Sequence, residues 1–510
     1  VDLASRAVIS SKTAGAVNLT QVDIEEEDLV SFTESSLGLV REPDGVVFMG
    51  DYFVTADEGD LFGGSRGFTI FDMNLNPVFK PGNQVEHLVA MVGHTNEGRH
   101  ENKGAEPENV FFGVFEDEKL LFVNLERVGI VLAYNVDSPT EPKFKQYLPA
   151  GVGPEGGVAI PSRGLVAVAN EKDARDDKIR SHISIYQLKE MGTPPYPTLI
   201  SADRPDGTPI PFSALSGLAA GSGSTLYSVE DSAFKKSRFF EIDVSTFPAT
   251  LIKETRLVDT NDVFANMAPQ GNFSAEDLAA LINDDKTVNI DPEGIAMGKN
   301  FLLLASEGRG TVGDEARPVE SLNFLFKVSF DGVILEVITL PEELNQIQLR
   351  FGFEGVAIDG DKAYVTFQRA WGDEVNPRIG IYDLVAKSWS FASYPLDTPE
   401  SQYGGWVGLS DIAPLGNKQF LVLERDNQGG PDASIKKIYK IDMASYSSGT
   451  VKKILYKDLM EDLKSAGGLV YEKVEGLAVT DKGEIWIVND NDGVDDNSGE
   501  NQLMMVGTYW

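Results

Sequence analysis

The chain has 510 residues, a formal net charge of −35 and no cysteine. So acidic a protein disfavours binding to nucleic acid or to an anionic membrane, and it favours binding of cations. The absence of cysteine excludes disulfides and thiolate-ligated metals, and no apolar run is long enough for a membrane-spanning helix.

The N-terminal segment, residues 1–28, precedes the first repeat described below. Its alternating stretch Ala16–Val22 predicts a single strand. Because Val1 is not an initiator methionine, either a processed mature chain or an artificially trimmed one is expected.

A unit of two strands joined by a short turn recurs along the rest of the chain. Its clearest copy opens at Glu293-Gly294, turns at residues 298–300 and closes at Glu307, fourteen positions after it opened. Because a hairpin returns to where it began, its opening and closing residues lie at the same end of the sheet. The eight copies open at Asp44, Glu108, Glu155, Ser216, Glu293, Glu354, Ser410 and Glu475.

Each copy is followed by a third apolar strand, such as Phe324–Val328, and five copies are followed by a fourth. Four antiparallel strands repeated about eight times are typical of a β-propeller. The sequence therefore predicts an all-β fold, a single β-propeller domain over residues 1–510 with about eight four-stranded blades. The last copy has only three strands, so the N-terminal strand is expected to pair with it and close the ring.

Two helices are predicted as short inserts on the face that carries the acidic ends. Ser274 is a favourable N-cap for a helix over residues 274–282, which has acidic residues in its first turn. The second helix is predicted at residues 459–464.

The polar residues that open and close the repeats are expected to form a ring at one mouth of the propeller channel. A turn residue next to glycine explains any single copy, but a turn requires glycine and does not require glutamate. So many carboxylates do not stay ionised together without cations, and oxygen-only ligands favour Ca²⁺ first, then Mg²⁺ or another divalent metal. The predicted metal ligands are Glu58, Glu108, Glu126, Glu155, Asn170, Glu171, Glu230, Glu293, Glu307, Glu354, Glu424, Glu475, Asn489 and Asp490.

Four arginines lie next to these acids: Arg127, Arg309, Arg369 and Arg425. Each either forms a local ion pair with the neighbouring carboxylate or binds a phosphate through two hydrogen bonds. Metals and arginines at one mouth suit a phosphate ester, because metals neutralise phosphoryl oxygens and activate water. The residues predicted to act in catalysis are Glu293, Glu354, Arg309, Arg369 and Arg425.

Motifs in the first part of the chain resemble the choice-of-anchor I domain found in atypical alkaline phosphatases. They are residues 98–108, 124–127, 153–156 and 169–171, together with 55–60, where Asp57 stands at a usual asparagine. Lys103 lies within the first of these motifs and is added to the predicted phosphate-binding residues.

Motifs in the second part, from Ser216 onward, resemble the esterase-like phytase domain. They are residues 291–294, 353–355, 474–476 and 489–492. The two resemblances divide the chain into a choice-of-anchor I-like half, 1–200, and an esterase-like phytase half, 210–510. They imply a secreted phosphoesterase, extracellular or periplasmic, that depends on a metal.

The predicted function is that of a Ca²⁺-dependent phosphomonoesterase of the alkaline phosphatase type, acting on small phosphate esters at alkaline pH. Some propeller phosphatases with a similar arrangement of acids use a cysteine-ligated iron, which this chain cannot form. Two alternatives stay open from the sequence: a non-catalytic binding propeller stabilised by Ca²⁺, and a phytase or phosphodiesterase that uses the same site.

Overall fold

The computed structural model describes residues 4–59, 61–174, 176, 178–189, 192–467, 470–494 and 497–509. It is mostly β-structure, and its contacts divide the chain into two compact units. Unit 1 comprises residues 1–197, 203–212 and 492–500, and unit 2 comprises residues 198–202, 213–491 and 501–510. The division near residue 200 falls where the sequence motifs change from one type to the other.

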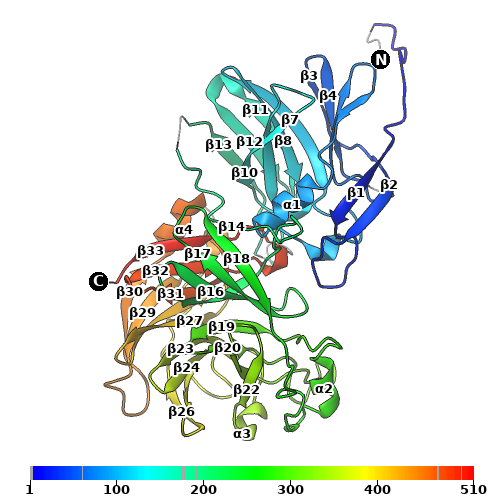
Figure 1. Cartoon of the computed structure of the whole chain (residues 1–510). Coiled ribbons are helices and arrows are strands. Elements are labelled where there is room, and N and C mark those ends of the chain that lie inside the picture. Colours follow the sequence, from blue (N-terminus) through cyan, green and yellow to red (C-terminus); the bar gives the residue numbers. More distant parts are fainter. Residues whose placement is uncertain are drawn as a thin grey trace. The chain divides into compact units, whose positions relative to one another are not determined.

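Unit 1 contains a two-stranded sheet and three larger antiparallel sheets, coloured blue to cyan in Figure 1. The two-stranded sheet is β1 (Ala16–Val22) and β2 (Glu34–Val40). The larger sheets are β3 (Val46–Met49), β4 (Tyr52–Asp57), β5 (Gly67–Asp72) and β6 (Pro77–Phe79); β7 (Pro107–Phe115), β8 (Glu118–Leu125), β9 (Ile130–Asn135) and β10 (Lys143–Pro149); and β11 (Pro154–Ile160), β12 (Leu165–Asn170) and β13 (His182–Gln187).

The three larger sheets of unit 1 form a row in which the first strand β7 contacts both β3 and β11. Apolar residues of β7 to β9 pack on residues of β11 and β12, with Phe111 stacked on Phe122. The helical elements of this unit are α1 (Gln84–Met91), η1 (Glu97–Arg99), η2 (Glu126–Val128), η3 (Pro161–Arg163) and η5 (Asp492–Val494).

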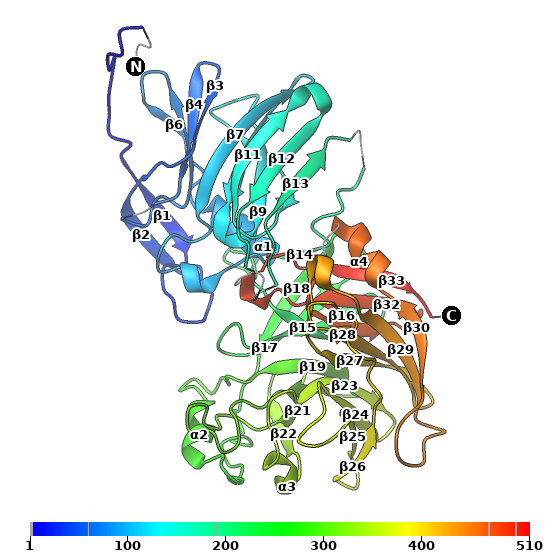
Figure 2. The same ribbon diagram turned by 180° about the vertical axis from the view of Figure 1, so that it is seen from behind.

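Unit 2 contains five sheets, coloured green to red in Figure 2. Their strands are β14 (Leu199–Ser201), β15 (Leu215–Ala220), β16 (Thr225–Glu230), β17 (Arg238–Asp243) and β18 (Ala249–Arg256); β19 (Pro292–Met297), β20 (Leu302–Ser306), β21 (Phe324–Val328) and β22 (Ile334–Thr339); β23 (Phe353–Asp359), β24 (Lys362–Phe367), β25 (Arg378–Asp383) and β26 (Ser388–Ser393); β27 (Val407–Gly416), β28 (Gln419–Asp426), β29 (Lys436–Asp442) and β30 (Lys453–Asp458); and β31 (Val474–Val479), β32 (Glu484–Asn489) and β33 (Leu503–Thr508).

The first strands of these five sheets contact one another in a cycle. Strand β15 contacts β19, β19 contacts β23, β23 contacts β27, β27 contacts β31, and β31 contacts β15. Four apolar clusters fill the spaces between consecutive sheets, the largest of them containing Phe264, Phe324 and Phe326. Unit 2 therefore has a propeller-like arrangement, because consecutive sheets pack face to face at the four junctions that these clusters fill.

This arrangement differs from the predicted single ring of about eight blades. Five of the eight repeats lie in the cycle of unit 2, and three lie in unit 1. The N-terminal strand also differs from the prediction, because β1 pairs with β2, and β33 pairs with β32. Among the described strands, no pairing joins β1 to β33.

Both predicted helices are present. The first is α2 (Ala275–Ala280), whose N-cap Ser274 forms a capping box with Asp277. The second is α4 (Met460–Gly467). Unit 2 also contains α3 (Glu342–Asn345) and η4 (Gly430–Asp432). No helix in the described part of the chain is long and apolar enough to cross a bilayer.

The glycine of the repeated Glu-Gly pair is explained by the closeness of the first strands in unit 2. A Cβ on Gly294 would lie 2.4 Å from the carbonyl oxygen of Glu354, and one on Gly217 would lie 2.6 Å from the Cα of Gly294. Neither distance admits a methyl group, so the cycle requires glycine there because neighbouring backbones touch.

Asp411 connects three sheets of the cycle through backbone hydrogen bonds. Its fully buried carboxylate accepts the N–H groups of Ile412 (2.8 Å), Leu477 (2.7 Å) and Leu218 (3.3 Å). Leu477 lies on β31 and Leu218 on β15, so this side chain, on β27, links the first strands of three sheets.

Candidate functional site

The acidic residue of each Glu-Gly pair lies where the pairing of the first two strands is interrupted. Between β19 and β20 the register shifts between Pro292 and Gly294, which leaves Glu293 outside the ladder. Equivalent shifts occur at Glu354 and Glu475 in unit 2 and at Glu108 and Glu155 in unit 1. Such β-bulges redirect a side chain away from its sheet. The sequence predicted the acids at these strand ends but not the bulge.

The central feature of unit 2 is a group of three carboxylates, Asp231, Asp291 and Glu293. One carboxylate oxygen of each lies within 4.8 Å of the other two. Asp231 follows β16, and Asp291 and Glu293 stand at the start of β19, so neighbouring sheets of the cycle supply the group. Ser216 Oγ donates a hydrogen bond of 3.0 Å to Glu293 Oε2. Asp231 and Asp291 were not among the predicted metal ligands.

Burial and mutual repulsion keep part of this group protonated near neutral pH. Burial and the charge of Asp291 raise the pKa of Asp231 to about 7, and burial and the charge of Asp231 raise the pKa of Glu293 well above its usual range. Burial opposes ionisation of Asp291 too, but its hydrogen bond with Asp231 and the charge of Arg309 lower its pKa. A divalent cation would replace the shared protons.

Glu307 and Glu354 extend the acidic group around the cycle. Glu307 accepts the N–H of Gly352 at 2.8 Å, and burial and the charge of Asp291 raise its pKa to about 8. Glu354 accepts a hydrogen bond of 2.6 Å from Gln368 Nε2, and burial and the charge of Glu475 raise its pKa.

Arg425 is the buried cation of this site. It pairs with Glu475, and its Nε donates to Ser410 Oγ at 3.1 Å. Its Nη1 is buried and has no hydrogen-bond partner in the described structure. Although burial opposes ionisation, the charge of Arg425 lowers the pKa of Glu475. One guanidinium nitrogen of Arg425 is thus left unsatisfied by the described residues.

The two other predicted arginines of unit 2 are held differently. Arg309 is partly exposed, and its Nε lies 3.4 Å from Asp291 Oδ2. The guanidinium of Arg369 packs on two aromatic rings that contact each other, 4.6 Å from the ring centre of Phe351 and 4.9 Å from that of Trp406. In the described part of the chain, no carboxylate forms an ion pair with Arg369.

Four other predicted ligands of unit 2 already have partners within the protein. Glu230 pairs with the buried Arg238, and Glu424 lies 2.7 Å from Lys453 Nζ. Asp490 lies 2.8 Å from Lys473 Nζ, and Asn489 Oδ1 accepts the N–H of Gln502 at 2.7 Å. These groups lie outside the carboxylate triad.

The predicted ligands of unit 1 form a second acidic group. Three triads of carboxylates lie within the same 4.8 Å distance, and they include Asp44 and Glu106, which are not among the metal ligands predicted from the sequence. The triads are Asp44, Glu58 and Glu108; Glu58, Glu106 and Glu126; and Glu126, Glu155 and Glu171.

The predicted phosphate ligands of unit 1 are engaged in ion pairs. Lys103 Nζ lies 2.6 Å from Glu58 Oε1, and Arg127 contacts Glu106 at 3.1 Å and Glu126 at 3.0 Å. Asn170, the remaining predicted metal ligand, accepts the N–H of Gly151 at 2.9 Å and so supports a turn.

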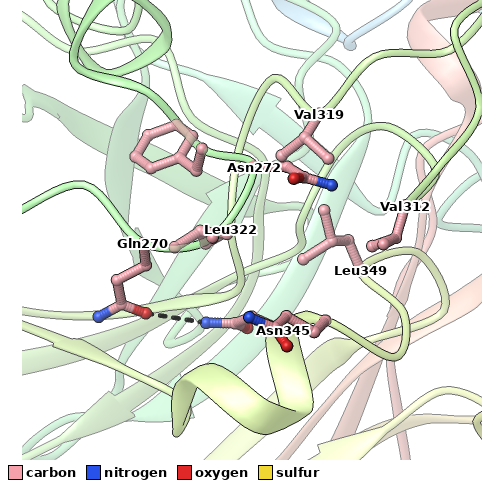
Figure 3. A pocket seen from close by; sticks show the side chains of 10 residues that line it. Gln270, Asn272, Val312, Val319, Leu322, Asn345 and Leu349 are labelled. Carbon is pink, nitrogen blue, oxygen red and sulfur yellow. Dashed lines mark hydrogen bonds between the residues drawn. The ribbon is translucent and has the colours of Figure 1, made fainter.

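Unit 2 also has a pocket lined by apolar and amide side chains, with an empty space of about 230 Å³ that includes open solvent (Figure 3). Asn345 Nδ2 donates to Gln270 Oε1 at 3.1 Å beside Val319, Leu322 and Leu349. No carboxylate lines this pocket, so it is separate in chemistry from the acidic site.

Comparison with protein families gives two matches along the chain. Residues 210–493 match the family model "Phytase-like", described as the esterase-like activity of phytase. Residues 61–139 match the choice-of-anchor I domain. Both resemblances inferred from the motifs are therefore confirmed. No curated protein matches the sequence.

Several solved structures align with the chain at low identity. The AfRom2 CNH domain aligns over 83% of this chain and 96% of its own, with 12% identity and a TM-score of 0.22. Apo AztD from Citrobacter koseri aligns over 83% and 86%, with 13% identity and a TM-score of 0.23. The Dos1 propeller aligns over 92% and 94%, with 9% identity and a TM-score of 0.26.

Proposed function

Because this chain belongs to the phytase-like family of esterase domains, we propose that unit 2 is a metal-dependent hydrolase of phosphate monoesters, of the alkaline phosphatase type. The observation that carries the proposal is the triad of Asp231, Asp291 and Glu293, in the same electrostatic network as the buried Arg425. Carboxylates for a cation and a guanidinium for an anion are the two requirements of phosphoryl transfer.

The triad fits a hard divalent cation. Its donors are carboxylate oxygens alone, which suits Ca²⁺ first and Mg²⁺ second. Asp231, Asp291 and Glu293 would hold the ion, with Glu307 and Glu354 as further oxygen donors beside them. When bound, the cation neutralises phosphoryl oxygens and makes water more acidic.

Arg425 binds the phosphate in this proposal. Glu475 and Ser410 fix the orientation of its guanidinium, and the unpartnered Nη1 donates to a phosphoryl oxygen. Arg309 and Arg369 supply further donors, and the rings of Phe351 and Trp406 hold Arg369 without neutralising it. Glu475 is thus a positioning residue for Arg425 and not a metal ligand.

We propose a small phosphate ester as the substrate and an extracellular or periplasmic location. The acidic net charge supports a protein that does not engage nucleic acid or insert into a membrane. The location rests on the family resemblance alone.

The test is hydrolysis of p-nitrophenyl phosphate by the full chain after chelation, with Ca²⁺, Mg²⁺ or Zn²⁺ added back. Glu293→Gln removes one ligand charge and keeps the shape, so we expect turnover to fall roughly 10- to 100-fold. Excess Ca²⁺ should restore part of it. Glu336→Gln, which breaks only a surface pair with Lys387, is the matched control and should behave as wild type.

Full activity after exhaustive chelation would refute metal dependence. If Ca²⁺ raises the melting temperature while no ester is hydrolysed, unit 2 is a non-catalytic binding unit. If the protein is active, its rates on inositol phosphates and on bis(p-nitrophenyl) phosphate distinguish a phytase or a phosphodiesterase from a monoesterase.

A further inference from the structure

The acidic residues of unit 1 form one continuous row of seven carboxylates. Glu58 belongs to the first and second triads, and Glu126 belongs to the second and third. The row therefore runs without a break from Asp44 to Glu171.

The row crosses the ends of three consecutive sheets. Asp44 and Glu58 flank the hairpin of β3 and β4, while Glu155 stands at the bulge near the start of β11 and Glu171 directly follows β12. Glu126, between them, directly follows β8 of the middle sheet. Since β7 contacts β3 and β11, carboxylates of neighbouring sheets face each other across each junction.

The cations of unit 1 neutralise only one part of this row. Glu106 pairs with Arg99 and Arg127, and Lys103 pairs with Glu58. Within the described residues, no lysine or arginine lies within ion-pair distance of four carboxylates in the row. These four are Asp44, Glu108, Glu155 and Glu171.

An independent feature at the same junction is the side chain of Asn124, which is fully buried on β8. Its Nδ2 donates to the carbonyl oxygen of Glu155 at 2.8 Å, and its Oδ1 has no hydrogen-bond partner. Asn124 stands two positions before Glu126, which begins η2 directly after β8, and its hydrogen bond to Glu155 places it next to a second member of the row. A buried amide oxygen without a donor is unfavourable unless an ion or water satisfies it.

We propose that unit 1 binds more than one Ca²⁺ ion along this row, with Glu58 and Glu126 as shared ligands and Asn124 Oδ1 as a neutral ligand near Glu155. The ligand set is made of oxygen alone, and shared carboxylates with an amide oxygen suit the flexible coordination of Ca²⁺ better than the octahedral geometry of Mg²⁺. The ions join the ends of three sheets. This site is separate from the hydrolytic site of unit 2 and does not depend on its activity.

The experiment measures Ca²⁺ bound per full chain by equilibrium dialysis after chelation, together with amide hydrogen exchange with and without Ca²⁺. In the wild type, we expect Ca²⁺ to slow exchange at residues 105–127 and 153–171. Glu126→Gln should lower the number of bound ions and weaken Ca²⁺ binding at least tenfold, and it should remove that protection. Glu118→Gln, which breaks an exposed pair with Lys145 in the same unit, is the matched control.

Two further variants distinguish loss of Ca²⁺ binding in unit 1 from a folding failure and from loss of Ca²⁺ in unit 2. Glu171→Gln, at an exposed position, replaces Glu126→Gln if the latter fails to fold. Glu293→Gln should lose Ca²⁺ from unit 2 and keep the protection of unit 1. The proposal is overturned if Ca²⁺ protects no amide of unit 1, or if Glu126→Gln and Glu171→Gln bind as much Ca²⁺ as Glu118→Gln.

Discussion

The two units use the same Glu-Gly hairpin in different surroundings. In unit 2 five first strands contact one another in a cycle, and the acids at their bulges share one electrostatic network. In unit 1 three sheets stand in a row, and the acids form a line across their ends. The hairpin therefore fixes which end of a sheet carries the acid, and the packing of sheets decides whether the acids converge or spread.

The largest expected loss of stability comes from removing the Asp411 carboxylate, which connects three sheets of the cycle. Asp411→Ala leaves the buried N–H groups of Leu218, Ile412 and Leu477 unsatisfied, and each costs about 1–3 kcal/mol. We expect urea unfolding to show a loss on the order of 3 kcal/mol or more. Hydrogen exchange should place the loss in unit 2. Equal loss in both units would contradict the role of Asp411 as a connection within the cycle.

A smaller loss of stability should distinguish the five-sheet cycle of unit 2 from the three sheets of unit 1 when an equivalent glycine is replaced in each. Gly294→Ala brings a methyl group to 2.4 Å from the carbonyl oxygen of Glu354, and overpacking of this kind costs about 1–3 kcal/mol. At Gly156, in unit 1, the nearest atom to an added Cβ is 3.9 Å away. Gly156→Ala should therefore leave the melting temperature nearly unchanged. If both variants lose the same stability, close approach of first strands does not explain the motif.

The smallest expected effect is a pH dependence common to both units without metal. Burial is the main cause that raises the pKa of Glu307 and Glu108 to about 8 and of Asp231 and Glu126 to about 7. These values lie above those of unfolded carboxyls, so the stability they contribute is complete below about pH 4 and is lost as pH rises through 7 and 8.

In chelated protein the melting temperature should fall over that range, and saturating Ca²⁺ should abolish the decline. Glu307→Gln should reduce the decline in unit 2 alone, and Glu126→Gln should reduce it in unit 1 alone. A melting temperature that is constant from pH 5 to 9 without metal would contradict the protonated state of these groups.

The sequence predicted the elements better than their assembly. Hairpin periodicity located the eight repeats, and the cap at Ser274 located α2. The number of sheets in a ring depends on contacts between sheets, which leave no period in the sequence. For the same reason the pairing of β1 with β2 was missed.

The sequence predicted the kind of candidate site, a group of carboxylates, but not all of the residues that form it. The acids at the bulges, such as Glu293, were selected by their spacing. Asp231 directly follows the predicted Glu230, and Asp291 stands two positions before Glu293; only the fold brings both of them into the site. Glu230 has the expected spacing, but Arg238 on the neighbouring strand neutralises it. Such pairing is set by cross-strand register and not by distance along the chain.

The bulges have a consequence for how this mouth diversifies during evolution. A side chain that stands outside the ladder can be exchanged without disturbing the hydrogen bonds that pair the two strands. Unit 2 presents five such bulges, occupied in turn by Ser216, Glu293, Glu354, Ser410 and Glu475. Both serine and glutamate occupy these five positions on the same type of backbone, so one scaffold presents different oxygen ligands.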